Sequence, residues 1–158
     1  MNKATQLLSI SLVISVLVIY MTSDDWTKSH ATKVSEGKVM SVADGETLGA
    51  IINGEQEKIS LAYVDCPGRK QAGGDAATIA LVNAVEGQSV RFNIIDVDEH
   101  DRKVAEIFVN DQNINLFLVR TGHCYIDQAY AANKNDYIQA EDLAYKENLG
   151  VHKVASTN

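Results

Sequence analysis

Residues 47–64 read TLGAIINGEQEKISLAYV, two strand-forming runs separated by Asn53-Gly54. The runs at 47–52 and 57–64 are rich in β-branched and other apolar residues. Asn-Gly between such runs is a strong hairpin signal, because both residues tolerate positive φ. A shorter β-type run precedes them at 38–43. The sequence therefore predicts three consecutive strands, the last two joined as a hairpin.

The chain after this hairpin predicts three helices and two more strands. Asp75 is the expected N-cap of the first helix, and Gly87 is expected to end it. The remaining elements are two strands at 89–95 and 103–109, separated by an acidic loop, and two helices at about 113–121 and 136–148. Five strands with a helix between the third and fourth indicate a mainly β, α+β fold: an OB-type barrel with extra helices. Closing the barrel would remove exposed strand edges.

The composition fits one ordinary globular domain and not a nucleic-acid-wrapping protein. The chain has 158 residues and is 46% apolar and 22% charged, which excludes disorder or coiled coil as a description of the whole. Acidic residues outnumber basic ones 21 to 14, giving a net charge of −7. Proteins that bind nucleic acid by neutralising phosphates usually have the opposite balance, so we expect weak or no nucleic-acid binding.

The N-terminal residues 1–25 predict a signal peptide or a membrane anchor. Lys3 precedes an apolar run at 7–21, which is shorter than the ~20 residues that comfortably span a bilayer. The small residues Thr22-Ser23 make a poor cleavage site, so a cleaved signal and an uncleaved anchor both remain open, ahead of a buried helix. The charge at Lys3 favours the cytoplasmic side for the N-terminus. We therefore expect an exported protein, either secreted or anchored in the inner membrane and facing the periplasm.

The residues after this leader predict a linker at 26–36, a folded domain at 37–153 and a tail at 154–158. The domain contains two cysteines, Cys66 and Cys124. In an exported domain such a pair favours a disulfide, which stabilises by roughly 2–5 kcal/mol. In a cytosolic protein two buried thiols would be the better interpretation, and without CxxC spacing a metal site is not expected.

Four stretches carry a family resemblance: VADGETL at 42–48, ISLAYVDCP at 59–67, DEHDRKVAEI at 98–107 and NLFLVRTG at 115–122. In this order they resemble the staphylococcal nuclease-like, or thermonuclease, family, whose members show V-x-D-G-D-T-L, R-L-x-G-I-D-x-P-E, D-x-x-G-R-x-x-A and N-x-x-L-V-x-x-G. The resemblance implies an OB-type barrel and a calcium-dependent phosphodiesterase. In that family two aspartates and a backbone carbonyl hold the metal, two arginines grip the phosphate, and a glutamate is the base.

The resemblance transfers part of that site to this chain. It implies Glu46, in place of aspartate, and Asp65 as Ca²⁺ ligands, with the Cys66 carbonyl beside them. It implies Arg102 as the retained phosphate arginine. In this family the segment carrying Cys66 lies next to the one carrying Cys124, so the resemblance also favours a Cys66–Cys124 disulfide.

Three positions depart from the family pattern. Ser60 stands where an arginine is expected, Gly68 where the base is expected, and Asp101 where a glycine precedes Arg102. Asp101 adds a carboxylate that we expect to repel phosphate. The residues that could substitute are Arg69 for the arginine and Glu55, Glu57 or Glu99 for the base.

These departures favour a pseudoenzyme over an efficient nuclease. The first hypothesis is a nuclease-like domain with a degraded catalytic site, tethered to the membrane through 7–21 and acting as a binding or structural subunit of an envelope assembly. Its partner would be an envelope or membrane-complex protein. The alternative is an active Ca²⁺-dependent phosphodiesterase or endonuclease that hydrolyses DNA or RNA with a shifted arginine and base.

Two further signals have plainer interpretations. The segment 96–101 looks like a calcium loop but lacks the required glycine at its sixth position and the closing acid, so we expect a solvated turn. Tyr125, Tyr130 and Tyr137 could form a base-stacking platform or could pack the last helix onto the barrel. The four histidines, which share no metal-ligand spacing, are His30, His100, His123 and His152.

Overall fold

The computed structural model describes residues 33–153. The predicted leader and the tail lie outside the described residues. Within 33–153, none of the helices has the length and apolar character needed to cross a membrane.

The hairpin predicted around Asn53-Gly54 is confirmed. Strand β2 (Thr47–Ile52) pairs antiparallel with β3 (Glu55–Leu61), and Ile52 lies opposite Glu55. Asn53 and Gly54 have φ values of 54° and 85°, as a type I′ turn requires. The two-residue loop therefore fixes the register that turns alternate β2 side chains into the core.

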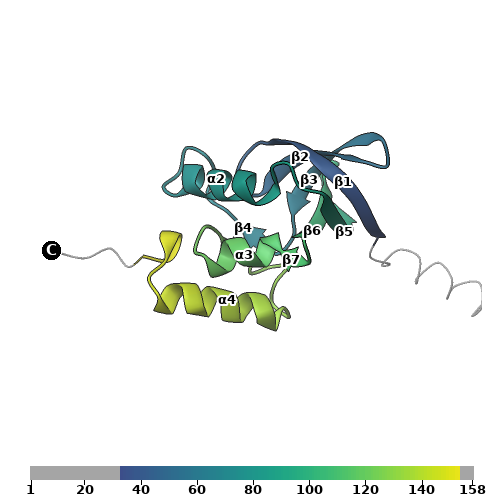
Figure 1. Ribbon diagram of the computed structural model, residues 1–158. Helices are drawn as coiled ribbons and strands as arrows, with labels where there is room; N and C mark the ends of the chain where they lie inside the picture. The colour runs from purple at the N-terminus through teal and green to yellow at the C-terminus, as the bar shows by residue number, and fades with distance from the viewer. Residues whose placement is uncertain (1–32, 154–158) are drawn as a thin grey trace, which may run out of the picture. The chain divides into compact units, whose positions relative to one another are not determined.

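Five strands close into the predicted barrel (Figure 1). β1 (Lys33–Val42) pairs with both β2 and β5 (Val90–Val97), and β5 pairs with β6 (Lys103–Val109). A parallel pairing of β3 with β6 completes the closure. The first strand begins at Lys33, so residues 33–36, predicted as linker, belong to the barrel. Their polar composition concealed this strand, because Ser35 is the one residue among the four that is buried.

The third strand, predicted at 57–64, begins and ends earlier in the chain than expected. β3 ends at Leu61, and Tyr63 takes a left-handed φ of 66°, which breaks the extended run. The chain then forms a two-residue strand, β4 (Val64–Asp65), which pairs with β8 (Tyr125–Ile126). A second short strand, β7 (Gln112–Asn113), extends the sheet beside β6.

The three predicted helices are present, followed by one 3₁₀ turn. They are α2 (Gly74–Val85), α3 (Ile114–Arg120), α4 (Asn135–Lys146) and η1 (Gly150–His152). Figure 1 shows α3 between the barrel strands and α4, and α3 contacts β6, α2 and α4. The predicted N-cap at Asp75 is wrong. Gly73 occupies that position with φ 90°, and Asp75 lies in the first turn, where its charge complements the helix dipole.

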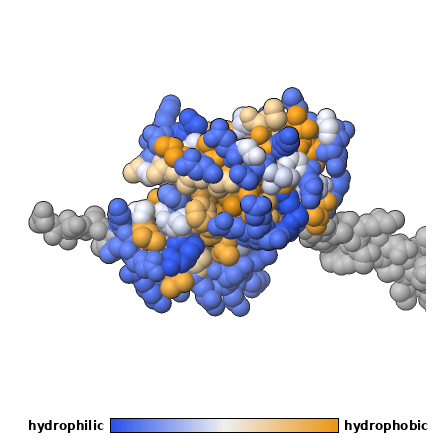
Figure 2. Space-filling model, viewed as in Figure 1, coloured by the Kyte–Doolittle hydropathy of each residue, from blue (hydrophilic) through white to orange (hydrophobic). Residues whose placement is uncertain are grey.

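The core fills the barrel and continues beneath the helices. Alternate residues of β2, β3, β5 and β6 point inward, and the same core includes buried residues of α2, α3 and α4, with α4 packed on α3. Figure 2 shows one face of the domain, where hydrophilic side chains predominate and hydrophobic residues lie between them.

Asn115 joins the helical layer to the barrel. Its side chain is fully buried and accepts a hydrogen bond from the Ile107 N–H at 3.0 Å. Its amide donates to the carbonyls of Ala62 at 2.9 Å and Ala105 at 3.0 Å. Because Ala62 opens the turn that leads to β4, this one side chain fixes the start of the segment that carries Asp65.

Candidate functional site

A cavity of ≈ 670 Å³ lies where the barrel meets β4 and the loop after β5. Four residues at the metal and phosphate positions of the family motifs line it: Glu46, Ser60, Asp65 and Arg102. They come from the turn before β2, from β3, from β4 and from the residue just before β6. The fold thus gathers into one cavity residues that are distant in sequence.

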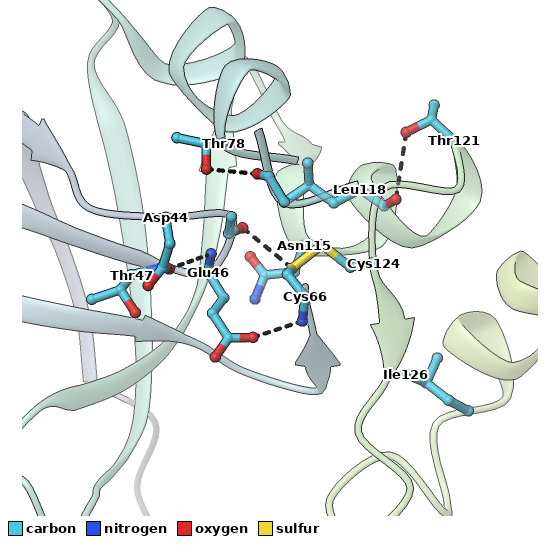
Figure 3. Close-up of a disulfide and its surroundings, with 12 residues drawn as sticks. Asp44, Glu46, Thr47, Cys66, Thr78, Asn115, Leu118, Thr121, Cys124 and Ile126 are labelled. Atoms are coloured by element: carbon cyan, nitrogen blue, oxygen red, sulfur yellow. Dashed lines mark hydrogen bonds between the residues drawn. A yellow bond between two sulfur atoms is a disulfide. The ribbon is translucent and has the colours of Figure 1, made fainter. Parts of the chain in front are cut away.

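A tight turn places Glu46 in this cavity. The Asp44 carboxylate accepts hydrogen bonds from the N–H groups of Glu46 at 3.0 Å and Thr47 at 2.8 Å. Gly45 lets the turn approach its neighbours, because a Cβ there would lie 2.7 Å from that of Ala77 and 3.0 Å from that of Cys66. The Glu46 carboxylate then accepts a hydrogen bond from the Cys66 N–H at 2.8 Å (Figure 3).

The electrostatic surroundings of Glu46 are short of positive charge. Burial raises the pKa of Glu46, and the carboxylates of Asp44 and Asp65 raise it further. The Cys66 N–H and the Arg102 guanidinium act in the opposite direction without cancelling the rise. A bound cation would therefore stabilise the ionised forms of these neighbouring carboxylates.

The donor types suit a hard cation such as Ca²⁺, although they do not form a closed cage. Glu46 and Asp65 offer carboxylate oxygens, which Ca²⁺ prefers. Within residues 33–153 no group of three or more His, Cys, Asp or Glu side chains is arranged to hold a metal. A cation here would need backbone carbonyl or water oxygens to complete its coordination, so the calcium site stays a prediction.

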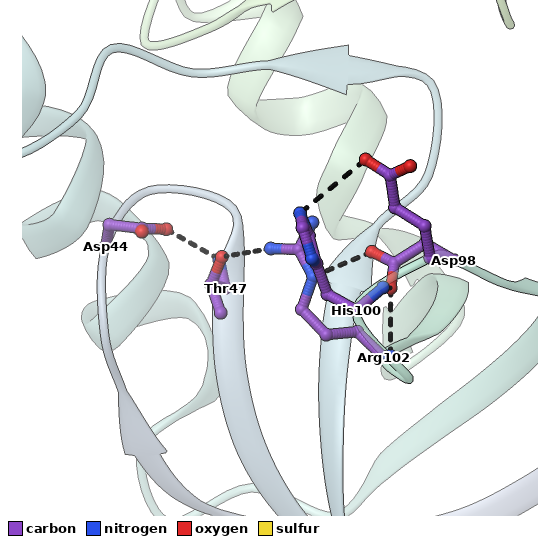
Figure 4. Close-up of polar contacts among 6 residues, drawn as sticks. Asp44, Thr47, Asp98, His100 and Arg102 are labelled. Atoms are coloured by element: carbon purple, nitrogen blue, oxygen red, sulfur yellow. Dashed lines mark hydrogen bonds and ion pairs between the residues drawn. The ribbon is translucent and has the colours of Figure 1, made fainter.

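Arg102 is held in place by two side chains. Its Nε donates to Asp98 Oδ2 at 2.7 Å, and its Nη1 lies 3.4 Å from Thr47 Oγ1 (Figure 4). Asp98 Oδ1 also accepts the Arg102 N–H at 2.9 Å. The hydrogen bond from the Arg102 N–H contributes most to lowering the pKa of Asp98. Asp98 and Thr47 fall inside the sequence motifs, but the motifs did not indicate their role in orienting Arg102.

The predicted disulfide is confirmed. Cys66 and Cys124 are bonded, which joins the end of β4 to the segment after α3 (Figure 3). The Cys124 side chain is fully buried, and Cys66 is nearly so. The bond therefore anchors the edge of the cavity to the helical layer.

The comparisons with known proteins agree with this architecture. The family described as "Staphylococcal nuclease homologue" matches residues 58–153. The chain belongs to the staphylococcal nuclease family. A protein of Haemophilus influenzae named "Uncharacterized endonuclease" is 30% identical over 115 residues, covering 72% of this chain and 64% of the relative.

Two further relatives carry similar names. An "Uncharacterized endonuclease" of Escherichia coli O157:H7 is 28% identical over 95 residues, covering 60% of this chain and 62% of the relative. A "Micrococcal nuclease" of Shigella flexneri is 25% identical over 125 residues, covering 73% and 72%. The chain spans a little under two thirds of the length of the two relatives named as endonucleases.

Two of the positions that depart from the nuclease-family pattern differ in their relation to the cavity. Ser60 lines the cavity. At this sequence position the family pattern has an arginine. Gly68 is not part of the lining, and its N–H donates to Gln71 Oε1 at 2.7 Å. Arg69, the candidate substitute, is also outside the lining, where its Nε donates to the carbonyl of Ala43.

The three candidate substitute bases are dispersed. Glu99 lines the cavity. Glu57 forms an ion pair with Lys103 on the neighbouring strand, and Glu55 is exposed at the start of β3. Glu99 is therefore the one of the three that the fold brings to the predicted site.

The cavity is strongly acidic. Among the described residues, Arg102 is the one lysine or arginine in the lining, and His100 is the one histidine. The six acidic residues of the lining are Glu46, Asp65, Asp96, Asp98, Glu99 and Asp127. Asp101 is not in the lining; it is exposed and has φ 58°, a conformation that favours glycine, as in the family pattern.

The remaining features singled out by sequence are the acidic segment at 96–101 and the three tyrosines. The solvated turn predicted for 96–101 is found only at 98–101, where Asp98 closes a turn whose residues 99–101 are exposed. Asp96 and Val97 instead end β5. The three tyrosines do not form one platform. Tyr137 is fully buried and bonded to Glu106, Tyr125 packs against His152, and Tyr130 lines the cavity.

Proposed function

We propose that this chain is a nuclease-like domain that has lost efficient phosphodiester hydrolysis and acts as a binding or structural subunit. The observation that carries the proposal is the charge of the cavity, whose lining has six carboxylates and a single arginine. Phosphate is anionic and gains further negative charge as it reacts. A lining with this balance repels the substrate and offers little stabilisation to the transition state.

The size of the expected defect follows from the two missing groups. Loss of a charge-stabilising donor, here at Ser60, commonly costs ~10²–10³-fold in rate. Loss of a general base, here at Gly68, costs ~10²–10⁴-fold. The two losses do not simply multiply, because such groups act as a unit.

Glu46, Asp65 and the Cys66 carbonyl are the groups that would hold Ca²⁺ in this domain. The charge deficit around Glu46 supports such a site. With two carboxylates and no third acidic or histidine ligand among residues 33–153, we expect weak binding, with Kd ~10⁻⁴–10⁻³ M. A bound Ca²⁺ would polarise a phosphoryl oxygen, and Arg102, oriented by Asp98, would contact the phosphate.

A nuclease assay on the full 158-residue chain tests the proposal. Wild type is compared with a Ser60→Arg/Gly68→Glu double variant on DNA and RNA, with and without Ca²⁺. The added glutamate has room, because a Cβ at Gly68 would meet Gln71 Oε1 at 3.7 Å and no closer atom. We expect near-background turnover for wild type and a gain of at least ~10²-fold for the double variant.

The matched control adds Arg102→Ala to the double variant and should remove the gain. Robust Ca²⁺-dependent turnover by wild type that Asp65→Ala abolishes would contradict the proposal.

That outcome would support the second candidate function, a working Ca²⁺-dependent phosphodiesterase or endonuclease acting on DNA or RNA. The observation that favours it is the orientation of Arg102, the arginine that matches the family motif, by Asp98 and Thr47. The names of the relatives are compatible with it. In this case Glu99, which lines the cavity, is the residue we expect to serve as base.

We further propose that the protein is exported and acts outside the cytoplasm. The sequence of the leader and the Cys66–Cys124 disulfide support this, because disulfides persist in oxidising compartments. Whether 7–21 stays as an anchor in the inner membrane, facing the periplasm, or is cleaved for secretion is tested by fractionating cells that express the C-terminally tagged full chain. Recovery in the cytoplasm with two alkylatable thiols would contradict export.

The proposed partner is a protein of an envelope or membrane complex, and not nucleic acid. Crosslinking in intact cells, followed by purification through the C-terminal tag, tests this. We expect one stoichiometric envelope protein whose capture is lost when the acidic lining is neutralised. Recovery of nucleic acid alone would oppose the proposal.

A further inference from the structure

We infer that the Cys66–Cys124 disulfide is a positioning element that holds Glu46 and Asp65 in their binding arrangement. The inference rests on the cation site of the proposed function. It gives the side chain of Cys66, whose backbone carbonyl belongs to the expected ligand set, a separate role in fixing where Glu46 and Asp65 lie.

Cys66 is the point where the two predicted ligands meet. Asp65 directly precedes Cys66 in the chain, and the Cys66 N–H donates to Glu46 Oε2 at 2.8 Å. The Cβ of Cys66 also borders the turn that carries Glu46, since a Cβ at Gly45 would lie 3.0 Å from it. Any movement of the Cys66 backbone therefore displaces both carboxylates.

Backbone pairing alone holds this segment weakly. β4 has two residues and pairs with a β8 of equal length, with Val64 opposite Ile126 and Asp65 opposite Tyr125. So short a ladder has little cooperative strength. In addition, Tyr63 just before it takes a left-handed φ of 66°, which is unfavourable for a tyrosine.

The other end of the disulfide is firmly held. The Cys124 side chain is fully buried, and its N–H donates to the Leu118 carbonyl at the end of α3 at 3.3 Å. The carbonyl of Cys124 lies 3.3 Å from Nε2 of the buried His152. The bond thus transfers the rigidity of the helical layer to Cys66.

Breaking the bond should free Glu46 to move. The Glu46 carboxylate is partly buried and lines the same cavity as the Asp65 carboxylate, and like charges repel each other. The Cys66 N–H opposes that repulsion at a fixed place. Without the covalent anchor, we expect the hydrogen bond to open more often and the two predicted ligands to separate.

The test uses the full chain and a Cys66→Ala/Cys124→Ala variant, which removes the bond but keeps the backbone N–H and carbonyl at position 66. The matched control is Val90→Ala, a truncation of a fully buried residue at the start of β5, outside the cavity lining. Two quantities are measured on folded samples: hydrogen exchange of the amide at position 66 by NMR, and Ca²⁺ affinity by calorimetry.

We expect the cysteine variant to lose protection at the position 66 amide and to bind Ca²⁺ ~10–100-fold more weakly, the range found when groups that orient metal ligands are removed. Val90→Ala should keep both at wild-type levels. Unchanged protection and unchanged affinity in the cysteine variant would overturn the inference. If wild type binds no Ca²⁺ but the cysteine variant still loses protection, the positioning role stands and the cation site of the proposed function fails.

Should the double variant not fold, the same readouts are made on folded wild type reduced with a phosphine. In that reaction the disulfide takes two electrons and two protons, with water as the source of oxygen for the phosphine oxide. Loss of protection at position 66 ahead of the barrel amides would support the inference, and loss at the same rate everywhere would overturn it.

Discussion

Removing the Asn115 side chain should cost a large part of the stability of this domain. In an Asn115→Ala variant, the Ile107 N–H and the Ala62 carbonyl lose their hydrogen-bond partner in a fully buried position. The Ala105 carbonyl keeps a partner, because it also accepts the Ala62 N–H at 2.8 Å. At roughly 1–3 kcal/mol for each buried group left without a partner, the free energy of unfolding should fall by about 2–6 kcal/mol.

Urea unfolding of the full oxidised chain, followed by circular dichroism, measures this change. The matched control is Asn113→Ala, the same substitution two residues earlier. Asn113 caps α3 by accepting the Leu116 N–H, and the Tyr137 hydroxyl and Glu106 that it also contacts stay bonded to each other. Loss of a cap costs typically ~1 kcal/mol, so the control should be clearly milder.

Comparing the loss in free energy of unfolding between the two variants tests whether Asn115 links α3 to the β3–β4 turn. If Asn115→Ala costs no more than Asn113→Ala, water or backbone rearrangement satisfies the freed groups, and Asn115 is not the link between α3 and the β3–β4 turn that its hydrogen bonds indicate. Hydrogen exchange adds a local readout, since the amides of β4 should lose protection first in Asn115→Ala.

Three further outcomes are expected from single features. Reducing the Cys66–Cys124 disulfide, with a sequence separation of 58, should lower the free energy of unfolding by up to about 4 kcal/mol in the chain-entropy account; an unchanged urea midpoint in reductant would contradict this. Asp101→Gly should raise the melting temperature, because the residue sits at φ 58° and glycine removes a strain of ~1 kcal/mol; a lower melting temperature would show that the aspartate makes a compensating contact. Because the pKa of Asp98 lies below its ordinary 3.8, its contact with Arg102 stabilises the fold above that pH and is lost as pH falls further. The melting temperatures of wild type and Asp98→Asn should therefore differ at pH 6 and approach each other as the pH falls below 3.8, and a constant difference would refute this.

The parts of the fold that depend on local chemistry could be predicted from the sequence. Asn53-Gly54 specifies its turn directly, and alternating apolar residues specify which face of each strand is buried. The disulfide was predictable through the family resemblance, because the pairing depends on which segments the fold brings together.

The errors arose where tertiary contacts override local preference. Tyrosine favours extended structure, yet Tyr63 is left-handed because the neighbouring Ala62 N–H is drawn to Ala105 and the Tyr63 carbonyl accepts the Asp127 N–H. No local pattern reveals a two-residue ladder such as β4–β8. The polar start of β1 is a strand because β5 provides its pairing partners, with Lys33 opposite Ile94.

The candidate site shows the same division. The motif positions singled out Glu46, Ser60, Asp65 and Arg102, and the fold brings these four residues to one cavity. The orientation of Arg102 by Thr47 could not be predicted, because these residues are 55 positions apart and their contact depends on side-chain direction across the barrel. The direction of the Arg69 side chain could not be predicted either: this candidate substitute extends to the carbonyl of Ala43.

The parallel pairing of β3 with β6 has a consequence for how the chain is made. Ile59 pairs with Lys103, and Leu61 pairs with Ala105. The barrel therefore cannot close until β6 has been synthesised and has left the ribosome. A nascent or prematurely terminated chain that stops before Lys103 carries β3 as an open edge, able to pair with the same edge of another chain. Truncated products of this protein should therefore accumulate as aggregates. The full-length chain should not, because its own β6 pairs with the β3 edge.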